Sequence, residues 1–412
     1  MKSFKELGIN SILENKLKER SIENPTAIQN LVIPNLLARK NIIFRSATGT
    51  GKTFAYLLPS LQLLSEENVN YQQGPVLLII APTFELCSQI KIEVDFLTKT
   101  HKQGLTSVQL VGSIKIDKQI ETLRKNKPAI VIGNPGRVLS LAKMGKLKLN
   151  NLHFLILDEA DRLTVQECIE ETTELLELIG RFNQRTQLKQ NSICFAACSA
   201  TVSKKTGMQL GPLFKNAEII ESDDHEILTE YIEHWAIFSE KRRKDQTLRS
   251  LLSALNNAAG KKSPVKALVF TSRNDDALFI LSHLLHHQTA AEGLFSKVSK
   301  KPISITARKE ALDSFRNGNV NVLVSTDLAA RGLDIPDITH VIALDVPSDS
   351  EFYIHRCGRT GRAGKKGIMV TIGDETQMRL LAAMEKKLKI KIYPKELHYG
   401  KITAPLPIED DE

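Results

Sequence analysis

A phosphate-binding pattern near the N-terminus is the feature that most constrains this chain. The apolar run 42–44 leads into the octapeptide 46–53, Ser-Ala-Thr-Gly-Thr-Gly-Lys-Thr, and helix-forming residues 54–58 follow it. A strand, a glycine-rich turn and a helix N-terminus in this order let backbone N–H groups and the helix dipole surround phosphate oxygens. Ser46 stands where a first glycine is usual, and it is small enough to fit. We therefore predict a nucleotide site in this loop.

The side chains that close the loop indicate the chemistry that it supports. Lys52 is placed to reach the β- and γ-phosphates of a nucleoside triphosphate, and the hydroxyl of Thr53 is placed to bind Mg²⁺. The residues predicted to surround the nucleotide are Ser46, Ala47, Thr48, Gly49, Thr50, Gly51, Lys52 and Thr53. The alternative is an ordinary glycine-rich turn before a helix, which would hold no nucleotide.

Length and composition describe a globular protein of more than one domain. A chain of 412 residues exceeds a single ordinary core, so we expect two domains of about 200 residues each. The formal net charge of +9 favours an acidic partner, with nucleic acid the first candidate. Five cysteines without paired zinc spacing favour a reducing compartment. Because there is neither an apolar signal core nor an apolar run of membrane-spanning length, we expect a cytoplasmic protein with no membrane partner.

Strand-like runs alternate with segments of helix length through the first half of the chain. The runs 76–80, 130–132 and 154–157 are apolar at every position, as is typical of parallel strands buried on both faces. This alternation predicts an α/β fold with a parallel sheet covered by helices. Functional residues in such sheets gather just past the carboxyl ends of the strands.

An acidic cluster, Asp158-Glu159-Ala160-Asp161, follows the strand-like run 154–157 directly. In a chain with a phosphate loop, Asp158 is the expected second anchor for Mg²⁺. Glu159 is then placed to orient and deprotonate an attacking water. A helix N-cap is the alternative, and it accounts for Asp158 alone.

With Ser199-Ala200-Thr201 and two later blocks, 326–334 and 355–362, these motifs resemble the DEAD-box RNA helicases of helicase superfamily 2. The resemblance covers about residues 4 to 375. It implies an α/β fold of two tandem RecA-like domains, each a mainly parallel sheet with helices on both faces. It also implies ATP and Mg²⁺ as cofactors.

A polar, acidic stretch marks the boundary that we expect between these two domains. The predicted organisation is an N-terminal ATP-binding domain over residues 1–220, a linker over 221–229, a C-terminal helicase domain over 230–392 and a short tail over 393–412.

Three residues near the N-terminus bear on adenine binding. Gln29, in the sequence Pro-Thr-Ala-Ile-Gln, can donate to and accept from the adenine edge at once. Phe4 stands at the upstream aromatic position of the same family motif and is predicted to bind ATP. Ile22 stands where the family has an aromatic ring over the base, so we expect weaker stacking.

The second half of the chain has no phosphate loop and is expected to act on the nucleotide of the first. The resemblance places Gly332 and Asp334 on the nucleotide, with Asp334 aimed at the ribose. Arg359 and Arg362 are aimed at the γ-phosphate, where such an arginine adds roughly 10³–10⁵ in rate in related NTPases. Coupling of ATP hydrolysis to RNA handling is assigned to Asp161, Ser199, Thr201 and His355.

The resemblance also supplies a set of RNA-binding residues. They are Pro82, Thr83, Gly112, Pro135, Gly136, Arg137, Thr271, Ser272, Arg273, Arg308 and Thr326. Four departures from the family pattern fall among them: Phe84 replaces Arg, Ser113 replaces Gly, Asn134 replaces Thr and Ile305 replaces Gln. These departures predict weaker RNA binding than in a typical member. Lysines at 297, 300 and 301 either substitute as phosphate binders or belong to a solvated loop.

Two further patterns favour ordinary structure over chemistry. His283, His286 and His287 share a helical face and could bind a metal, but a solvated helix is the simpler interpretation. Cys194 and Cys198 lie on an apolar, extended segment, so they are expected to pack rather than to bind metal.

The chain is therefore predicted to be an RNA-dependent ATPase that unwinds short RNA duplexes or remodels RNA–protein complexes. We expect a monomer that contacts the RNA backbone without regard to sequence, with possible protein cofactors. Two alternatives remain: a DNA helicase of the same superfamily, and an RNA-binding assembly factor with weak ATPase activity. Comparing RNA with DNA as activator of ATP hydrolysis tests the first alternative, and the presence of Lys52, Glu159, Arg359 and Arg362 argues against the second.

Overall fold

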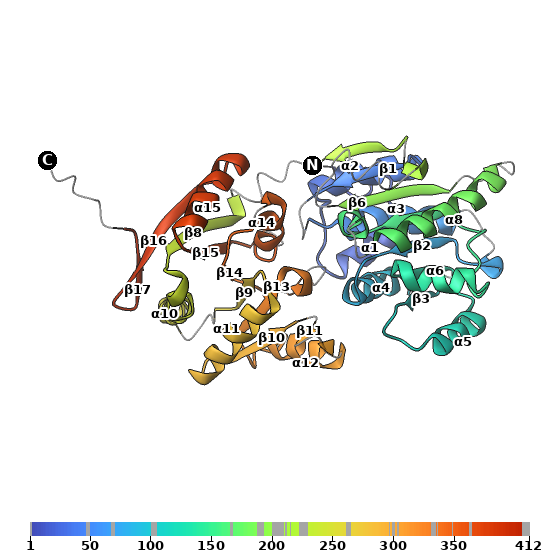
Figure 1. Ribbon diagram of the computed structural model, residues 1–412. Coiled ribbons are helices and arrows are strands. Elements are labelled where there is room, and N and C mark those ends of the chain that lie inside the picture. The colour runs from blue at the N-terminus through green and yellow to red at the C-terminus, as the bar shows by residue number, and fades with distance from the viewer. Residues whose placement is uncertain are drawn as a thin grey trace. The chain divides into compact units, whose positions relative to one another are not determined.

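The chain divides into two units, residues 1–223 and 224–412, in a computed structural model (Figure 1). Residues 222–229 of the predicted linker lie outside the described residues. The structure describes residues 2–46, 50–66, 71–99, 105–164, 168–187, 193–199, 210, 212–214, 216–221, 230–260, 265–295, 297–298, 301–302, 305–330, 335, 337–347, 349–361 and 365–405.

The first unit is built on a parallel sheet of seven strands in the order β3-β4-β2-β5-β6-β1-β7. Strands β2, β4, β5 and β6 are buried at every position, as their apolar sequences predict. The strands are β1 (Ile42–Arg45), β2 (Leu77–Ile80), β3 (Ser107–Leu110), β4 (Ile130–Gly133), β5 (Phe154–Leu157), β6 (Cys194–Ser199) and β7 (Glu218–Glu221).

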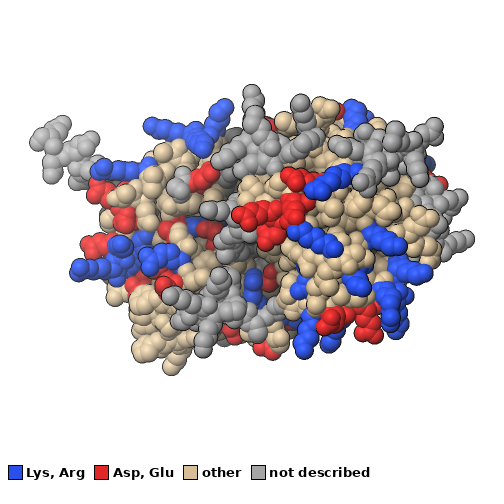
Figure 2. Space-filling model, turned by 45° about the vertical axis from the view of Figure 1, so that its right-hand side comes forward, with Lys and Arg blue, Asp and Glu red and all other residues tan. Residues whose placement is uncertain are grey.

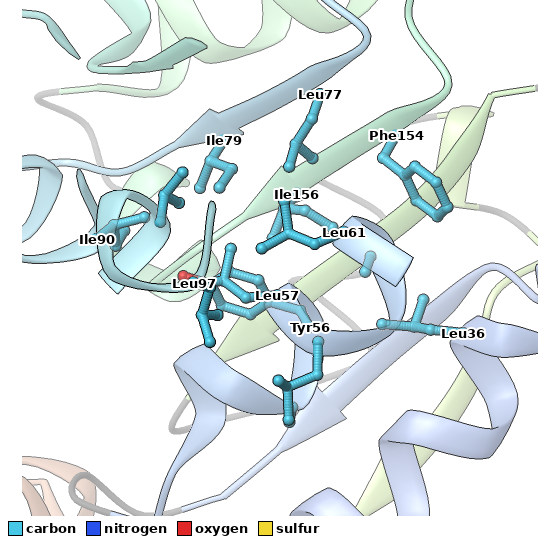
Figure 3. Packing of buried hydrophobic residues seen from close by; sticks show 14 of the residues in the cluster. Leu36, Tyr56, Leu57, Leu61, Leu77, Ile79, Ile90, Leu97, Phe154 and Ile156 are labelled. Carbon is cyan, nitrogen blue, oxygen red and sulfur yellow. The ribbon is translucent and has the colours of Figure 1, made fainter. Parts of the chain in front are cut away.

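Helices cover both faces of this sheet. Because successive side chains of a strand point to opposite faces, Leu77 and Ile79 join one hydrophobic cluster while Leu78 and Ile80 join another. Figure 3 shows the first cluster, in which Tyr56 of α3 lies among these buried side chains. The helices are α1 (Ser11–Lys18), α2 (Ala27–Leu37), α3 (Lys52–Glu66), α4 (Phe84–Thr98), α5 (Ile116–Asn126), α6 (Pro135–Lys143), α7 (Ala160–Leu163) and α8 (Ile169–Gln187), with 3₁₀ turns η1 (Tyr71–Gln73) and η2 (Pro212–Phe214).

The second unit has an eight-stranded sheet in the order β10-β13-β9-β14-β15-β8-β16-β17. All its neighbouring strands are parallel except β16 and β17. The strands are β8 (Ile232–Phe238), β9 (Ala267–Thr271), β10 (Ala291–Leu294), β13 (Val322–Thr326), β14 (His340–Ala343), β15 (Gly367–Gly373), β16 (Ile392–His398) and β17 (Lys401–Thr403), and a separate antiparallel pair is β11 (Lys297–Val298) with β12 (Lys301–Pro302).

Alternate residues of β9 again enter two different hydrophobic clusters, so this sheet is also buried on both faces. Both units are thus α/β with mainly parallel sheets, as predicted. The helices are α10 (Lys244–Ala259), α11 (Asn274–His286), α12 (Ile305–Arg316), α13 (Asp327–Ala330), α14 (Ser350–Cys357) and α15 (Glu375–Leu388), with the 3₁₀ turn η4 (Lys241–Arg243).

The sheet of the second unit continues past residue 392, where the sequence predicted a tail. Strand β16 pairs in parallel with β8, and β17 turns back on β16. The lysines and Pro394 of this segment are atypical of a strand, so the sequence did not predict its pairing with β8 and β17. Among the described residues, no helix is both long and apolar enough to cross a membrane.

Candidate nucleotide site and RNA interface

The phosphate loop connects the end of β1 to the start of α3. The Ser46 hydroxyl donates to the Thr50 hydroxyl at 2.7 Å, which ties the two ends of the loop together. The Lys52 ammonium donates to the Ser46 carbonyl at 2.7 Å. Ser46 therefore also contributes a hydrogen bond that a glycine could not make, and this bond was not predicted. Ala47, Thr48 and Gly49 lie outside the described residues.

Gln29 ties the adenine motif to the same loop. Its side-chain oxygen accepts from the Thr26 backbone N–H at 2.9 Å, completing a capping box at the start of α2. Its side-chain nitrogen donates to the Gly51 carbonyl at 3.0 Å. Gly51 has φ +87°, and a Cβ there would lie 2.5 Å from the Gln29 nitrogen, so both conformation and space require glycine.

Phe4 and Ile22 both pack on the hydrophobic cluster of the first unit. Phe4 is 1% exposed and lies inside this cluster. Its contact with ATP stays a prediction. Ile22 is half-buried and packs on the same cluster.

Asp158 follows β5 directly and is held by three donors. One carboxylate oxygen accepts from the Tyr56 hydroxyl at 2.8 Å. The other accepts from the Cys198 thiol at 2.8 Å and from the Glu159 backbone N–H at 2.9 Å. Burial, and then the charge of Asp158, raise the pKa of both Tyr56 and Cys198 well above their ordinary values, so both remain protonated donors. Neither donor was predicted from the sequence.

Tyr56 also connects this carboxylate to the phosphate loop. Tyr56 lies in α3, the helix that begins at Lys52, and its hydroxyl donates to Asp158. Thr53, in the first turn of the same helix, and Asp158 are the two predicted Mg²⁺ ligands. Mg²⁺ prefers oxygen ligands such as hydroxyl and carboxylate groups, so Thr53 and Asp158 fit the ion.

Glu159 has a left-handed backbone, with φ +51° and ψ +53°, and is buried at the start of α7. Such conformations are uncommon for residues other than glycine and gather at functional sites. Nearby, the Ser46 backbone N–H donates to the Ser199 carbonyl at 3.3 Å, which joins a predicted coupling residue to the phosphate loop. Asp161 lies in the first turn of α7, and Thr201 lies outside the described residues.

The predicted RNA residues of the first unit meet at one edge of its sheet. Pro82, Gly112 and Asn134 follow the neighbouring strands β2, β3 and β4. A cavity of about 430 Å³ opens there, lined by Pro82, Gly112, Asn134, Pro135, Gly136, Arg137, Ser140, Cys168 and Glu171. The Arg137 guanidinium donates to the carbonyls of Ile114 at 2.7 Å and Gly112 at 3.0 Å. Arg137 therefore shapes the loop after β3.

Thr83 and Phe84 begin helix α4 beside this cavity. The Thr83 hydroxyl accepts from the Leu86 backbone N–H at 3.2 Å and so caps the helix. Phe84 is half-buried and packs on the hydrophobic cluster of the first unit. The ring that replaces the family arginine therefore has an inward packing role.

In the second unit, the predicted RNA residues follow β9 and β13. Thr271 and Thr326 end these strands and lie directly opposite each other. Ser272 and Arg273 are exposed just beyond β9. An Arg308 guanidinium nitrogen donates to the Ala329 carbonyl at 3.1 Å. These five residues therefore gather around the carboxyl ends of two paired strands.

Arg356, a residue that the sequence did not single out, organises this edge. Its guanidinium donates two hydrogen bonds of 2.7 Å to the Asp327 carboxylate and one of 2.9 Å to the Asp345 carbonyl, and it forms an ion pair at 2.8 Å with the Asp345 carboxylate. Asp345 also accepts from the Ser272 backbone N–H at 2.6 Å. Burial alone would lower the pKa of Arg356, but the bond to Asp327 and the charge of Asp345 raise it above its ordinary value. The arginine is therefore a fixed cation that joins three loops.

The comparisons with known proteins agree with this geometry. Residues 26–209 match the DEAD/DEAH box helicase family, and residues 243–364 match the helicase conserved C-terminal domain. The DEAD-box ATP-dependent RNA helicase CshC of Bacillus cereus is 30% identical over 395 residues, covering 96% of this chain and 94% of that protein. This chain belongs to the DEAD-box helicase family.

Solved structures of DEAD-box helicases share its fold of two RecA-like domains. S. cerevisiae Dbp5 bound to RNA and ADP BeF3 is 25% identical with a TM-score of 0.76, over 96% of this chain and 95% of that one. Mss116p bound to ssRNA and AMP-PNP is 25% identical with a TM-score of 0.81, over 95% of this chain and 78% of that one.

The last family motif of this DEAD-box helicase covers residues 355–362, of which the structure describes 355–361. Arg359 is buried, and its Nε donates to the His355 carbonyl at 3.3 Å. Gly361 has φ +67°, and a Cβ there would lie 2.7 Å from Ile232. Arg362, Gly332 and Asp334 lie outside the described residues.

Proposed function

We propose that this chain is an ATP-dependent RNA helicase of the DEAD-box type that couples RNA-stimulated ATP hydrolysis to local unwinding of short duplexes or to remodelling of RNA–protein complexes. The observation that carries the proposal is the bond from Tyr56, on the helix that begins at the phosphate loop, to Asp158, whose carboxylate also accepts from the Glu159 backbone N–H. It joins a phosphate loop to a buried, oriented carboxylate pair.

Thr53 and Asp158 would hold Mg²⁺, which neutralises developing charge on the phosphates when bound. Glu159 would take the proton from the attacking water. Lys52, Arg359 and Arg362 would contact the phosphates, and Gln29 would bind the adenine. These roles come from the family resemblance together with the geometry above.

RNA would be held by its phosphate and 2′-hydroxyl groups, without regard to sequence. The supporting observation is that Pro82, Gly112 and Arg137 share one cavity, while Thr271 and Thr326 share one sheet edge. We further propose a cytoplasmic monomer. All five cysteines are free, which favours a reducing compartment, and one chain carries every predicted catalytic residue.

The experiment measures the rate of ATP hydrolysis under three conditions: in the presence of single-stranded RNA, in the presence of DNA of the same sequence, and without nucleic acid. RNA should stimulate hydrolysis and DNA should not. Equal stimulation by DNA would favour a DNA helicase of the same superfamily. No stimulation by either, with RNA still bound, would favour an assembly factor with weak ATPase activity.

A further inference from the structure

The basic segment 386–401 has no part in the proposed function. It contains six lysines and one glutamate, together with Tyr393 and Tyr399. Over the whole face shown in Figure 2, basic and acidic side chains are interspersed, so net charge alone locates no partner.

The fold carries the segment away from the predicted RNA motifs of the second unit. Its strand β16 pairs with β8, whereas Thr271 and Thr326 end β9 and β13, which lie on the other side of β14 and β15. Ile392 begins β16, so the start of the segment lies at the amino edge of the sheet and those motifs at the carboxyl edge. Since β15 has seven residues, the two edges are roughly 20 Å apart.

Two aromatic rings lie side by side on this part of the sheet. Tyr393 of β16 is directly opposite Trp235 of β8, so both side chains are on the same face. Each ring carries a lysine: the Lys391 ammonium is 5.1 Å from the Tyr393 ring centre, and the Lys395 ammonium is 5.3 Å from the Trp235 ring centre. Tyr393 is 39% exposed. We call these four residues the edge surface.

A cavity of about 720 Å³ adjoins the edge surface at the amino edge of the sheet. Lys366, Lys391 and Tyr393 are among its lining residues, as are Glu230 and Glu233. The Glu233 carboxylate accepts from the Trp235 indole N–H at 2.7 Å, so this acid is engaged with the aromatic pair. A cavity of this size accommodates a nucleoside.

We propose that the edge surface is a second binding site for single-stranded RNA, outside the helicase motifs. Trp235 is half-buried and packs on a hydrophobic cluster, whereas Tyr393 is exposed. Aromatic rings flanked by lysines are the chemistry that stacks bases and pairs with phosphates in single-strand binding proteins. The proposal rests on the proposed function only in taking RNA as the partner. The edge surface would hold a flanking strand while the helicase motifs hold the segment to be remodelled.

Trp235 gives a direct test because it is the only tryptophan of the chain. An RNA of about 40 nucleotides should quench its fluorescence, whereas an RNA of about 8 nucleotides, which fills a single site, should quench it less at equal saturation. Unchanged emission with saturating long RNA would overturn the proposal.

A double variant, Tyr393→Ala with Lys391→Ala, tests the site by affinity. Both side chains are solvent-facing, so the fold should be retained. The dissociation constant for the long RNA should rise about fivefold or more through lost stacking. The slope of log affinity against log salt should flatten by about 0.7 through the lost lysine. Binding of the short RNA should not change.

The matched control is Phe279→Ala with Lys241→Ala, which removes an exposed aromatic and an exposed lysine elsewhere on the same unit. It should leave both RNAs unaffected. An equal loss of affinity for the long RNA in both double variants would overturn the proposal. No loss of affinity in either variant would also overturn it, and would leave an acidic protein as the partner. Stimulation of ATPase activity by the short RNA reports on the proposed function separately.

Discussion

The side-chain nitrogen of Gln29 donates to the Gly51 carbonyl at 3.0 Å, within a contact so close that no side chain fits at Gly51. The residue that would read adenine is therefore bonded to the loop that would hold the phosphates. Base recognition and loop conformation share one amide.

Gln29→Glu replaces this donor with a carboxylate facing a carbonyl. Losing a buried hydrogen bond and leaving an acceptor unpaired costs about 1–3 kcal/mol, so the dissociation constant for ATP should rise about tenfold. Titration with a fluorescent ATP analogue measures it. The control is Asn35→Asp, which changes an exposed amide on the same helix. Equal affinity in the parent and Gln29→Glu proteins would show that the amide holds neither the base nor the loop.

Arg356→Met should destabilise the second unit, because it leaves the carboxylates of Asp327 and Asp345 without their cation. Removing one partner of a buried ion pair costs about 3–5 kcal/mol. Urea unfolding followed through Trp235 reports on this unit. Arg379→Met is the matched control, since Arg379 bonds to Glu375 on an exposed helix face and should matter by less than about 1 kcal/mol. Similar decreases in the free energy of unfolding for both variants would contradict a stabilising role of the buried network around Arg356.

His340 should make stability depend on pH. Burial lowers the pKa of His340 to about 4, below its ordinary value of 6.5. Between pH 4 and 6.5 the unfolded chain therefore binds more protons at this histidine than the folded protein does. The contribution of neutral His340 to the free energy of unfolding is fully present above pH 6.5 and is lost as the pH falls towards 4. One pH unit changes the free energy of unfolding by at most about 1.4 kcal/mol. Urea unfolding of the parent and of His340→Gln at several pH values should show a flatter dependence in the variant. Identical dependence would contradict a buried, neutral imidazole.

The sequence predicted the parts of the site that local patterns encode. Apolar runs located the buried strands, and Asp158 and Glu159 followed one of them as expected. Glycine and lysine spacing located the phosphate loop. The donors Tyr56 and Cys198 escaped prediction because they reach Asp158 from other elements, 102 and 40 residues away in the chain.

Tertiary packing also decided what the sequence left open. Phe84 could have faced RNA or the interior, and its contact with the hydrophobic cluster shows inward packing. Phe4 matched a family position, and the structure adds that its ring is buried in the hydrophobic cluster. Strand β16 pairs with both β8 and β17, and no local sequence pattern predicted it.

The proposed function assigns to Glu159 the role of the base in RNA-stimulated ATP hydrolysis. Glu159→Gln preserves size and hydrogen bonding but removes the proton acceptor, and general-base catalysis contributes about 10²–10⁴ in rate. Steady-state ATPase at saturating RNA, with ATP and RNA binding measured on the same protein, is the decisive measurement. We predict that turnover falls at least about 100-fold while both ligands still bind. Hydrolysis at the parental rate would contradict the account.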